Sequence, residues 1–354
     1  MKEIHEILQE AVERKASDIF IVSGFPLSYK INDVIQPVED EKLMPDTTEA
    51  LLRQIYELDG NRKIEQLIHT GDDDFSFSIK GLGRFRCSAY KQRNSLAAVL
   101  RVVYFNLPDA ESLGIPSIVT ELSKKKKGLV LITGSAGSGK STTLACIIDR
   151  INRSRCSHII TIEDPIEFLH AHRLSIVSQR EVSHDTKGYV QALRAALRQS
   201  PDVILLGEMR DFETIQTALT AAETGQLVLS TLHTTGASKT IDRIIDVFPA
   251  EQQQQIRIQL SMVLEAVVSQ QLIPAKDGRL IPAFEIMMVN SAIRNLIREG
   301  KTPQMDSFIT MNSQNGSILM DAALQKMVRE GTITQAEAIR YARDPETVQS
   351  MRRY

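Results

Sequence analysis

The clearest chemical signature in the chain is the run Gly134-Ser-Ala-Gly-Ser-Gly-Lys-Ser141, which fits G-x-x-x-x-G-K-[ST]. Glycines lack a Cβ, so the backbone amides of such a run can turn toward an anion. Lys140 would reach the β- and γ-phosphates of ATP, and the Ser141 hydroxyl would bind Mg²⁺. We predict an ATP site in the run and the residue after it: Gly134, Ser135, Ala136, Gly137, Ser138, Gly139, Lys140, Ser141 and Thr142.

The sequence on either side supplies the elements that must position this loop. Residues 129–132 are an apolar stretch typical of a strand, and residues 142–152 have the pattern of a helix. The positive end of that helix would face the phosphates. A chance glycine-rich turn is the alternative, and the flanking strand and helix argue against it.

An acidic residue follows a second predicted strand, residues 202–206. In open α/β sheets, ligands bind at the carboxyl ends of the strands. Glu208 lies at such an end, where it could help to hold Mg²⁺ and orient or deprotonate the attacking water. Gly207 occupies the usual Walker B aspartate position, so Glu208 is predicted to be the principal acid of this strand.

Two further strand ends carry polar side chains. Residues 158–162 lead into Glu163, and residues 227–231 are followed closely by His233. Considered alone, Glu163 could belong to an acidic turn at the surface, and His233 could be a hydrogen-bonded polar residue without a role in catalysis. Because parallel strands end at one edge of a sheet, we expect all three strand ends to converge on one crevice.

Arginines mark a predicted hairpin in the first third of the chain. A turn centred on Arg93-Asn94 would place Arg101 directly opposite Arg86. Like charges in that position destabilise a sheet unless an anion lies nearby. Phosphoryl transfer uses arginines, often from another subunit, so we expect Arg86 and Arg101 to face a neighbouring subunit's nucleotide. A solvated strand face is the alternative.

The bulk composition limits the remaining possibilities. The 354 residues are enough for two or three domains, and a net charge of −2 gives no global attraction to nucleic acid. No apolar run approaches the ~20 residues that span a bilayer, and we expect no signal peptide. The cysteines lack metal-ligand spacing, so we expect small buried residues in a reducing cytosol: Cys87, Cys146 and Cys156.

The pattern along the chain predicts four segments. Residues 1–105 have the mixed pattern of an α+β domain, and residues 106–127 form a connection. Strands alternate with helices over residues 128–286, which is typical of a parallel sheet wrapped by helices. Residues 287–354 are predicted to form short helices.

One of those helices is expected between Asn290, a plausible N-cap, and Gly300, a plausible stop. Its apolar residues recur at helical spacing and form one stripe. Arg294 and Arg298 lie four positions apart and would form a basic edge at the surface. A core-packing helix with two solvated arginines is the alternative to a functional role.

Taken together, four boxes resemble the secretion ATPases of type II and type IV secretion and of type IV pili. They are GSAGSGKSTTLA, ITIEDPIEF, LLGEMRD and STLHT, similar to the Walker A, Asp, Walker B and His boxes. The segment AIRNLIREG resembles the PilT-type retraction ATPases more narrowly. The likeness covers nearly the whole chain, although Ser135-Ala136 stands where the family usually has Pro-Thr.

The resemblance implies a PAS-like N-terminal domain, a RecA-like core and a homo-hexameric motor that uses ATP and Mg²⁺. It also implies a cytoplasmic location, with the inner-membrane platform of a type IV pilus machine as partner. No nucleic acid and no direct membrane insertion are expected. Family positions in the nucleotide site fall on Lys140, Ser141, Glu163, Glu208 and His233, and Arg86 and Arg101 match arginines offered across subunits.

The predicted function is therefore a motor that powers type IV pilus retraction, and hence twitching motility, by coupling ATP hydrolysis to pilus disassembly. Three other functions are the alternatives. A pilus extension or type II secretion ATPase commonly has a paired-cysteine zinc element and a longer N-terminal region, which this sequence does not show. A regulatory nucleotide-binding module is disfavoured because Lys140 and Glu208 are intact. A nucleic-acid translocase is disfavoured by the near-neutral charge and the lack of an aromatic and basic stripe.

Overall fold

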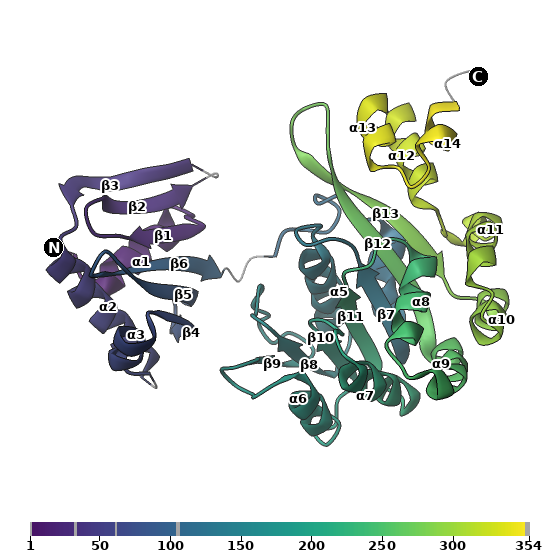
Figure 1. Cartoon of the computed structure of the whole chain (residues 1–354), viewed down its shortest axis with the longest axis horizontal. Helices are drawn as coiled ribbons and strands as arrows, with labels where there is room; N and C mark the ends of the chain where they lie inside the picture. Colours follow the sequence, from purple (N-terminus) through teal and green to yellow (C-terminus); the bar gives the residue numbers. More distant parts are fainter. Residues whose placement is uncertain (1, 32–33, 61, 104–106, 351–354) are drawn as a thin grey trace. The chain divides into compact units, whose positions relative to one another are not determined.

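The computed structural model describes residues 2–31, 34–60, 62–103 and 107–350. The chain forms two compact units, Met1–Asn106 and Leu107–Tyr354 (Figure 1). Within the described ranges, no helix combines the length and the apolar character needed to cross a membrane.

In the described residues of the first unit, three helices accompany an antiparallel sheet, in agreement with the predicted α+β class. Its strands lie in the order β3-β2-β1-β6-β5-β4. Apolar side chains of α1 and α2 pack against the sheet in a single core. The bounds are α1 Ile4–Glu13, β1 Asp18–Ile21, β2 Pro26–Ile31, β3 Val34–Lys42, α2 Pro45–Asp59, α3 Ile64–Thr70, β4 Asp72–Ile79, β5 Gly83–Gln92 and β6 Ser95–Val103.

The β5–β6 hairpin has the register that the sequence predicted. Arg93 and Asn94 form its turn with positive φ angles of 45° and 62°, and Arg86 lies directly opposite Arg101. On its other side Arg101 faces Asp18 of β1, and Arg101 Nε donates to Asp18 Oδ1 at 3.0 Å. This carboxylate offsets the repulsion between the arginines, so an external anion is not needed to stabilise the pair.

The second unit is built on a seven-stranded sheet in the order β13-β12-β7-β11-β10-β8-β9. All neighbouring pairs are parallel except β12 and β13. β11 comes later in the chain than β10 but lies between β7 and β10, an arrangement expected of a RecA-like core. The strands are β7 Gly128–Thr133, β8 His158–Glu163, β9 Ile176–Glu181, β10 Val203–Leu206, β11 Leu227–Leu232, β12 Leu264–Pro274 and β13 Leu280–Met288.

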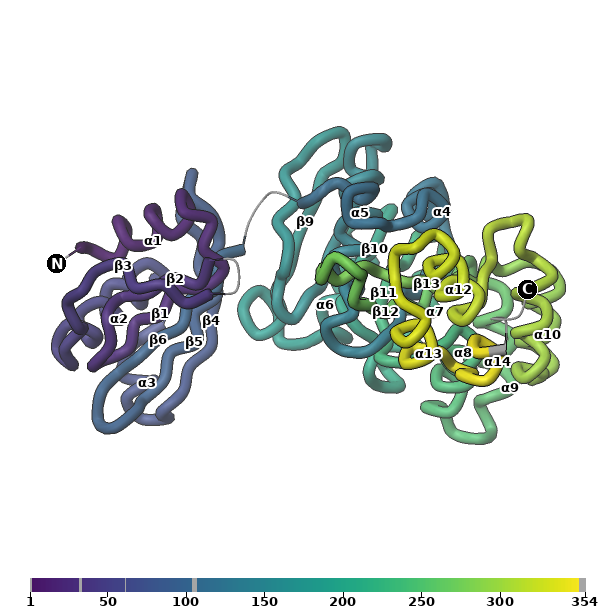
Figure 2. Tube along the Cα trace, turned by 90° about the horizontal axis from the view of Figure 1, so that it is seen from above, coloured from purple at the N-terminus to yellow at the C-terminus, as the bar shows by residue number. Residues whose placement is uncertain are grey.

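Helices cover both faces of this sheet, because alternate strand residues are buried on each side. α5 packs with one face, and α6 to α11 pack with the other (Figures 1 and 2). The helices are α4 Ser117–Thr120, α5 Lys140–Ser154, α6 Tyr189–Ala196, α7 Phe212–Glu223, α8 Ala237–Asp246, α9 Ala250–Val263, α10 Ser291–Glu299, α11 Met305–Met311, α12 Met320–Arg329, α13 Gln335–Tyr341 and α14 Pro345–Ser350.

The segments expected at 106–127, 128–286 and 287–354 are joined in this one unit. Ile115, Val119 and Leu122 are buried in the core beside α5, so the described part of the connection is packed structure. The last three helices share a small core with the β12–β13 hairpin. The finer limits of the four segments stay a prediction.

One prediction about the cysteines is wrong. Cys87 and Cys146 are buried, as expected, but Cys156 is exposed. Cys156 follows the end of α5 and precedes β8, so it lies in a connecting segment, where apolar packing does not cover it.

Candidate nucleotide-binding site

The predicted phosphate loop joins the end of β7 to the start of α5. Its glycines at 134, 137 and 139 have φ angles of 141°, 74° and 84°. A Cβ at Gly134 would lie 2.2 Å from the backbone oxygen of Gln270, and one at Gly139 would lie 2.8 Å from the side-chain Nε2 of Gln270. Gly134 is therefore required because the loop packs directly against the backbone of β12, and Gly139 is favoured by its positive φ angle.

Two hydrogen-bonded side chains at the start of α5 hold the loop in shape. Lys140 Nζ donates to the carbonyl oxygens of Gly134 and Ser135 at 2.9 and 2.8 Å. Burial lowers the pKa of Lys140. Thr143 Oγ1 donates to Gln270 Oε1 at 2.7 Å, across 127 positions of the chain. No sequence motif pointed to Gln270, whose role here depends on β12 lying beside β7.

The carboxyl ends of β7, β8, β10 and β11 meet at one edge of the sheet, as predicted, because these strands are parallel. A cavity of about 520 Å³ opens there. The strand-end residues Glu163, Glu208 and His233 line it together with Lys140 and Ser141. The structure thus brings the predicted nucleotide-site side chains of this unit together, although their individual roles stay predictions.

Glu208 lies at the centre of a polar cluster at this edge. Its Oε2 is 3.3 Å from His233 Nε2, and its Oε1 is 2.5 Å from Arg210 Nη2. A Cβ at Gly207 would lie 2.9 Å from the Tyr189 hydroxyl oxygen and 3.3 Å from a backbone oxygen of β8. Tyr189, which sequence reasoning missed, therefore explains why glycine occupies the usual aspartate position.

Glu163 occupies a site that favours its neutral form. Burial raises its pKa to about 7, although hydrogen bonds from Thr161 and Gln179 act in the opposite direction. Thr161 Oγ1 donates to Glu163 Oε1 at 2.6 Å, and Gln179 Nε2 donates to the same oxygen at 3.3 Å. A carboxyl group with a pKa near neutrality is suited to accept and return a proton.

This raised pKa predicts the pH dependence of hydrolysis. A base must be ionised, so kcat/KM for ATP is expected to rise as the pH increases through about 7 and then level off. Steady-state ATPase assays between pH 5.5 and 8.5 would measure this rise in kcat/KM. In Glu163→Gln, the residual kcat/KM should no longer rise with pH through about 7. If the pH profile of that variant stayed unchanged, another group would be responsible for the rise.

The arginines that we predict to act on nucleotide, Arg86 and Arg101, belong to the first unit. Their approach to a neighbouring subunit's nucleotide stays a prediction. His170 lines the cavity, where burial lowers its pKa to about 4. His172 Nδ1 accepts from the backbone of Val177 at 3.1 Å. Within the described ranges, no three histidine, cysteine or acidic side chains converge on a possible metal position.

Helix α10 has the predicted ends, but its basic edge differs from the prediction. The Asn290 side chain caps the first turn, and Gly300 ends the helix in the left-handed conformation. The Arg294 side chain is engaged within the protein and is not a free basic group at the surface. Its Nη1 donates to the backbone oxygen of Ser261 at 2.7 Å, and its Nη2 pairs with Glu265 at 2.8 Å. Arg294 thus holds the end of α9, and Arg298 is the exposed arginine of the helix.

The glycine loop, the acidic strand ends and the strand order define a P-loop ATPase with a RecA-like core. The chain belongs to the type II/IV secretion system protein family, which matches residues 1–340. This match covers both units of the structure.

Comparison with known proteins supports a more specific likeness. The chain is 43% identical over 344 residues to the type IV pilus retraction ATPase PilT of Pseudomonas aeruginosa, covering 97% of this chain and 99% of that protein. It is 47% identical over 291 residues to a twitching motility protein of Neisseria gonorrhoeae, covering 82% and 77%. The crystal structure of the pilus retraction motor PilT with bound ADP has a TM-score of 0.91 at 46% identity, covering 99% and 100%. The predicted resemblance to retraction ATPases is confirmed.

Proposed function

We propose that this ATPase powers the retraction of type IV pili, and hence twitching motility, by coupling ATP hydrolysis to pilus disassembly. The observation that carries the proposal is the nearly full-length likeness to the pilus retraction motor PilT, which includes both units. The capped helix over AIRNLIREG, the segment that resembles retraction ATPases in particular, adds support.

The site residues have distinct proposed tasks in hydrolysis. The amides of the glycine loop and Lys140 bind the phosphates of ATP. Ser141 and Glu208 face the same cavity and would hold Mg²⁺ together with phosphate oxygens, as suits an ion that dehydrates reluctantly. Glu163 and Glu208 would orient or deprotonate the attacking water, and His233 would position Glu208.

The proposed working form is a homo-hexamer at the cytoplasmic face of the inner membrane. Arg86 and Arg101 would complete the active site of a neighbouring subunit by offsetting charge on the γ-phosphate. The platform protein of the pilus machine would be the membrane partner, with no direct insertion of this chain. Nucleic acid is not a proposed partner, because the net charge of −2 provides no counter-charge for a phosphate backbone.

Deleting the gene and counting surface pili under the microscope tests this proposal. A retraction motor predicts excess pili that extend but fail to retract. Complementation with the parent gene should restore retraction, and complementation with Glu208→Gln at parental expression should not. Absence of pili would instead favour an extension ATPase, and normal pili with blocked protein export would favour a type II secretion ATPase.

A further inference from the structure

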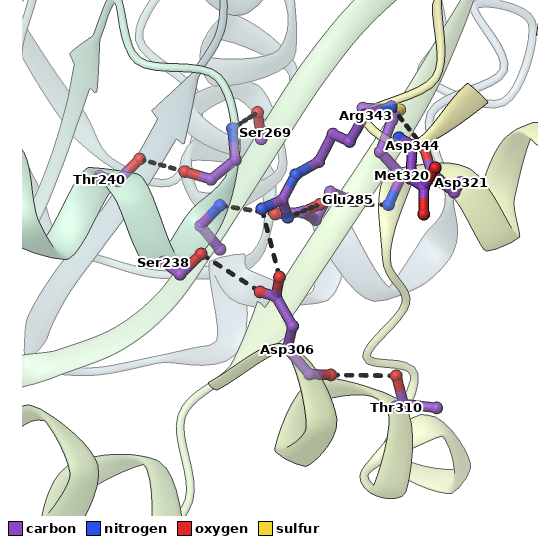
Figure 3. Close-up of polar contacts among 12 residues, drawn as sticks. Ser238, Thr240, Ser269, Glu285, Asp306, Thr310, Met320, Asp321, Arg343 and Asp344 are labelled. Atoms are coloured by element: carbon purple, nitrogen blue, oxygen red, sulfur yellow. Dashed lines mark hydrogen bonds and ion pairs between the residues drawn. The ribbon is translucent and has the colours of Figure 1, made fainter. Parts of the chain in front are cut away.

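An ion pair between a buried acid and a partly exposed arginine lies outside the proposed catalytic cluster, between the sheet and the last helices (Figure 3). Glu285 of β13 has no exposed surface, and its Oε2 is 3.2 Å from Nη1 of Arg343. The same carboxylate accepts from the backbone nitrogen of Ala237 at 2.6 Å and from that of Met320 at 3.2 Å. Ala237 begins α8 and Met320 begins α12, so one charge holds the starts of two helices.

The guanidinium of Arg343 extends this contact to a second acid. Its Nη2 pairs with Asp306 Oδ2 at 3.2 Å, and Asp306 Oδ1 accepts from the Ser238 hydroxyl at 3.2 Å. The backbone nitrogen of Arg343 is fixed in turn by Asp321 Oδ1 at 2.7 Å. The last helices are therefore tied to the first turn of α8 by two routes, one through Glu285 and one through Asp306.

The first turn of α8 is connected to the nucleotide site by a short, tightly bonded loop. Four positions before Ala237 lies His233, whose Nε2 is 3.3 Å from Glu208. Between them, Gly236 donates its backbone N–H to Ser269 Oγ at 2.9 Å. A Cβ at Gly236 would lie 3.6 Å from both the guanidinium carbon of Arg343 and Glu285 Oε1, so the arginine packs closely on the loop.

We propose that Arg343 and Glu285 are positioning residues for ATP hydrolysis: they tie the C-terminal helices to the start of α8 and so hold His233 against Glu208. Burying the Glu285 carboxylate is costly, so the pair with Arg343 is weak evidence for a role in stability alone. The forked contacts of Arg343 instead fix direction as well as distance. The role concerns the hydrolytic step and does not depend on which machine the motor serves.

A double-mutant cycle between Arg343 and His233 tests this role through the rate of hydrolysis. Arg343→Ala is expected to lower kcat roughly tenfold, because a displaced catalytic group loses rate steeply, and to change KM for ATP much less. Adding the same substitution to His233→Ala should cause no further loss, since the residue it positions is absent. Single-turnover hydrolysis would measure even the slow variants. Losses that multiply in the double variant would overturn the proposal.

Two further variants separate positioning from folding. Arg340→Ala removes an equally charged but more exposed side chain three positions earlier. This variant should leave kcat unchanged, both in the parent and in His233→Ala. Asp306→Asn loses only the outer pairing and is expected to fold even if Arg343→Ala does not. In the same double-mutant cycle, Asp306→Asn should lower kcat when it is introduced into the parent protein but not when it is introduced into His233→Ala. An equal loss of kcat in both backgrounds would contradict the proposal.

Discussion

Replacing Glu208 with glutamine is expected to leave Mg-ATP binding intact and to slow hydrolysis by ~10²–10⁴-fold. Glutamine keeps the shape of the side chain but loses its charge, so it cannot deprotonate water and pairs weakly with Arg210 and His233. Steady-state ATPase assays and binding of a fluorescent ATP analogue would measure the two effects. Lys140→Ala should instead abolish turnover by removing the cation that binds the phosphates.

A matched control for this substitution is Glu213→Gln, the same chemical change at an exposed position in the first turn of α7. Its turnover should remain at the parental level. If Glu208→Gln retained turnover within about threefold of the parent, far from the expected loss, Glu208 would not be the principal acid.

The second large effect concerns the arginines of the β5–β6 hairpin. Arg86→Ala and Arg101→Ala are expected to bind ATP but to hydrolyse it ~10³–10⁵-fold more slowly, as when an arginine offered to the γ-phosphate is lost. Because we propose that they act on a neighbouring subunit, mixing Arg101→Ala with Lys140→Ala should restore some activity. Mixed rings would contain interfaces in which both parts are intact. ATPase assays over a series of mixing ratios would measure the rescue.

The ion pair with Asp18 requires a control in this experiment. Arg101→Ala leaves the largely buried Asp18 carboxylate without this partner and could destabilise the first unit. Asp18→Asn removes the same pair while keeping Arg101, so it should retain most of the activity if the arginine acts on nucleotide. Equal losses in Asp18→Asn and Arg101→Ala, or no rescue at any ratio, would show that the arginine serves the fold.

Much of the candidate site could be predicted from the sequence, because its signals are local. Glycines at positive φ and a following helix specify the phosphate loop. A two-residue turn fixed the register of β5 and β6, and with it the pairing of Arg86 and Arg101. Asn290 and Gly300 marked both ends of α10. In each case, the residues that decide the conformation lie close together in the sequence, within one helix, one hairpin or one loop and the helix that follows it.

The partners of these residues depended on the tertiary structure. Gln270 supports the phosphate loop from a distant strand, and the Tyr189 hydroxyl lies where a side chain at Gly207 would go. Arg294 looked like a surface residue from its helical spacing, yet it binds the end of α9. Spacing along a helix gives the direction of a side chain but not the element that packs there. Sequence thus specified the loop and its elements, whereas packing between distant segments decided which side chains hold the catalytic groups in place.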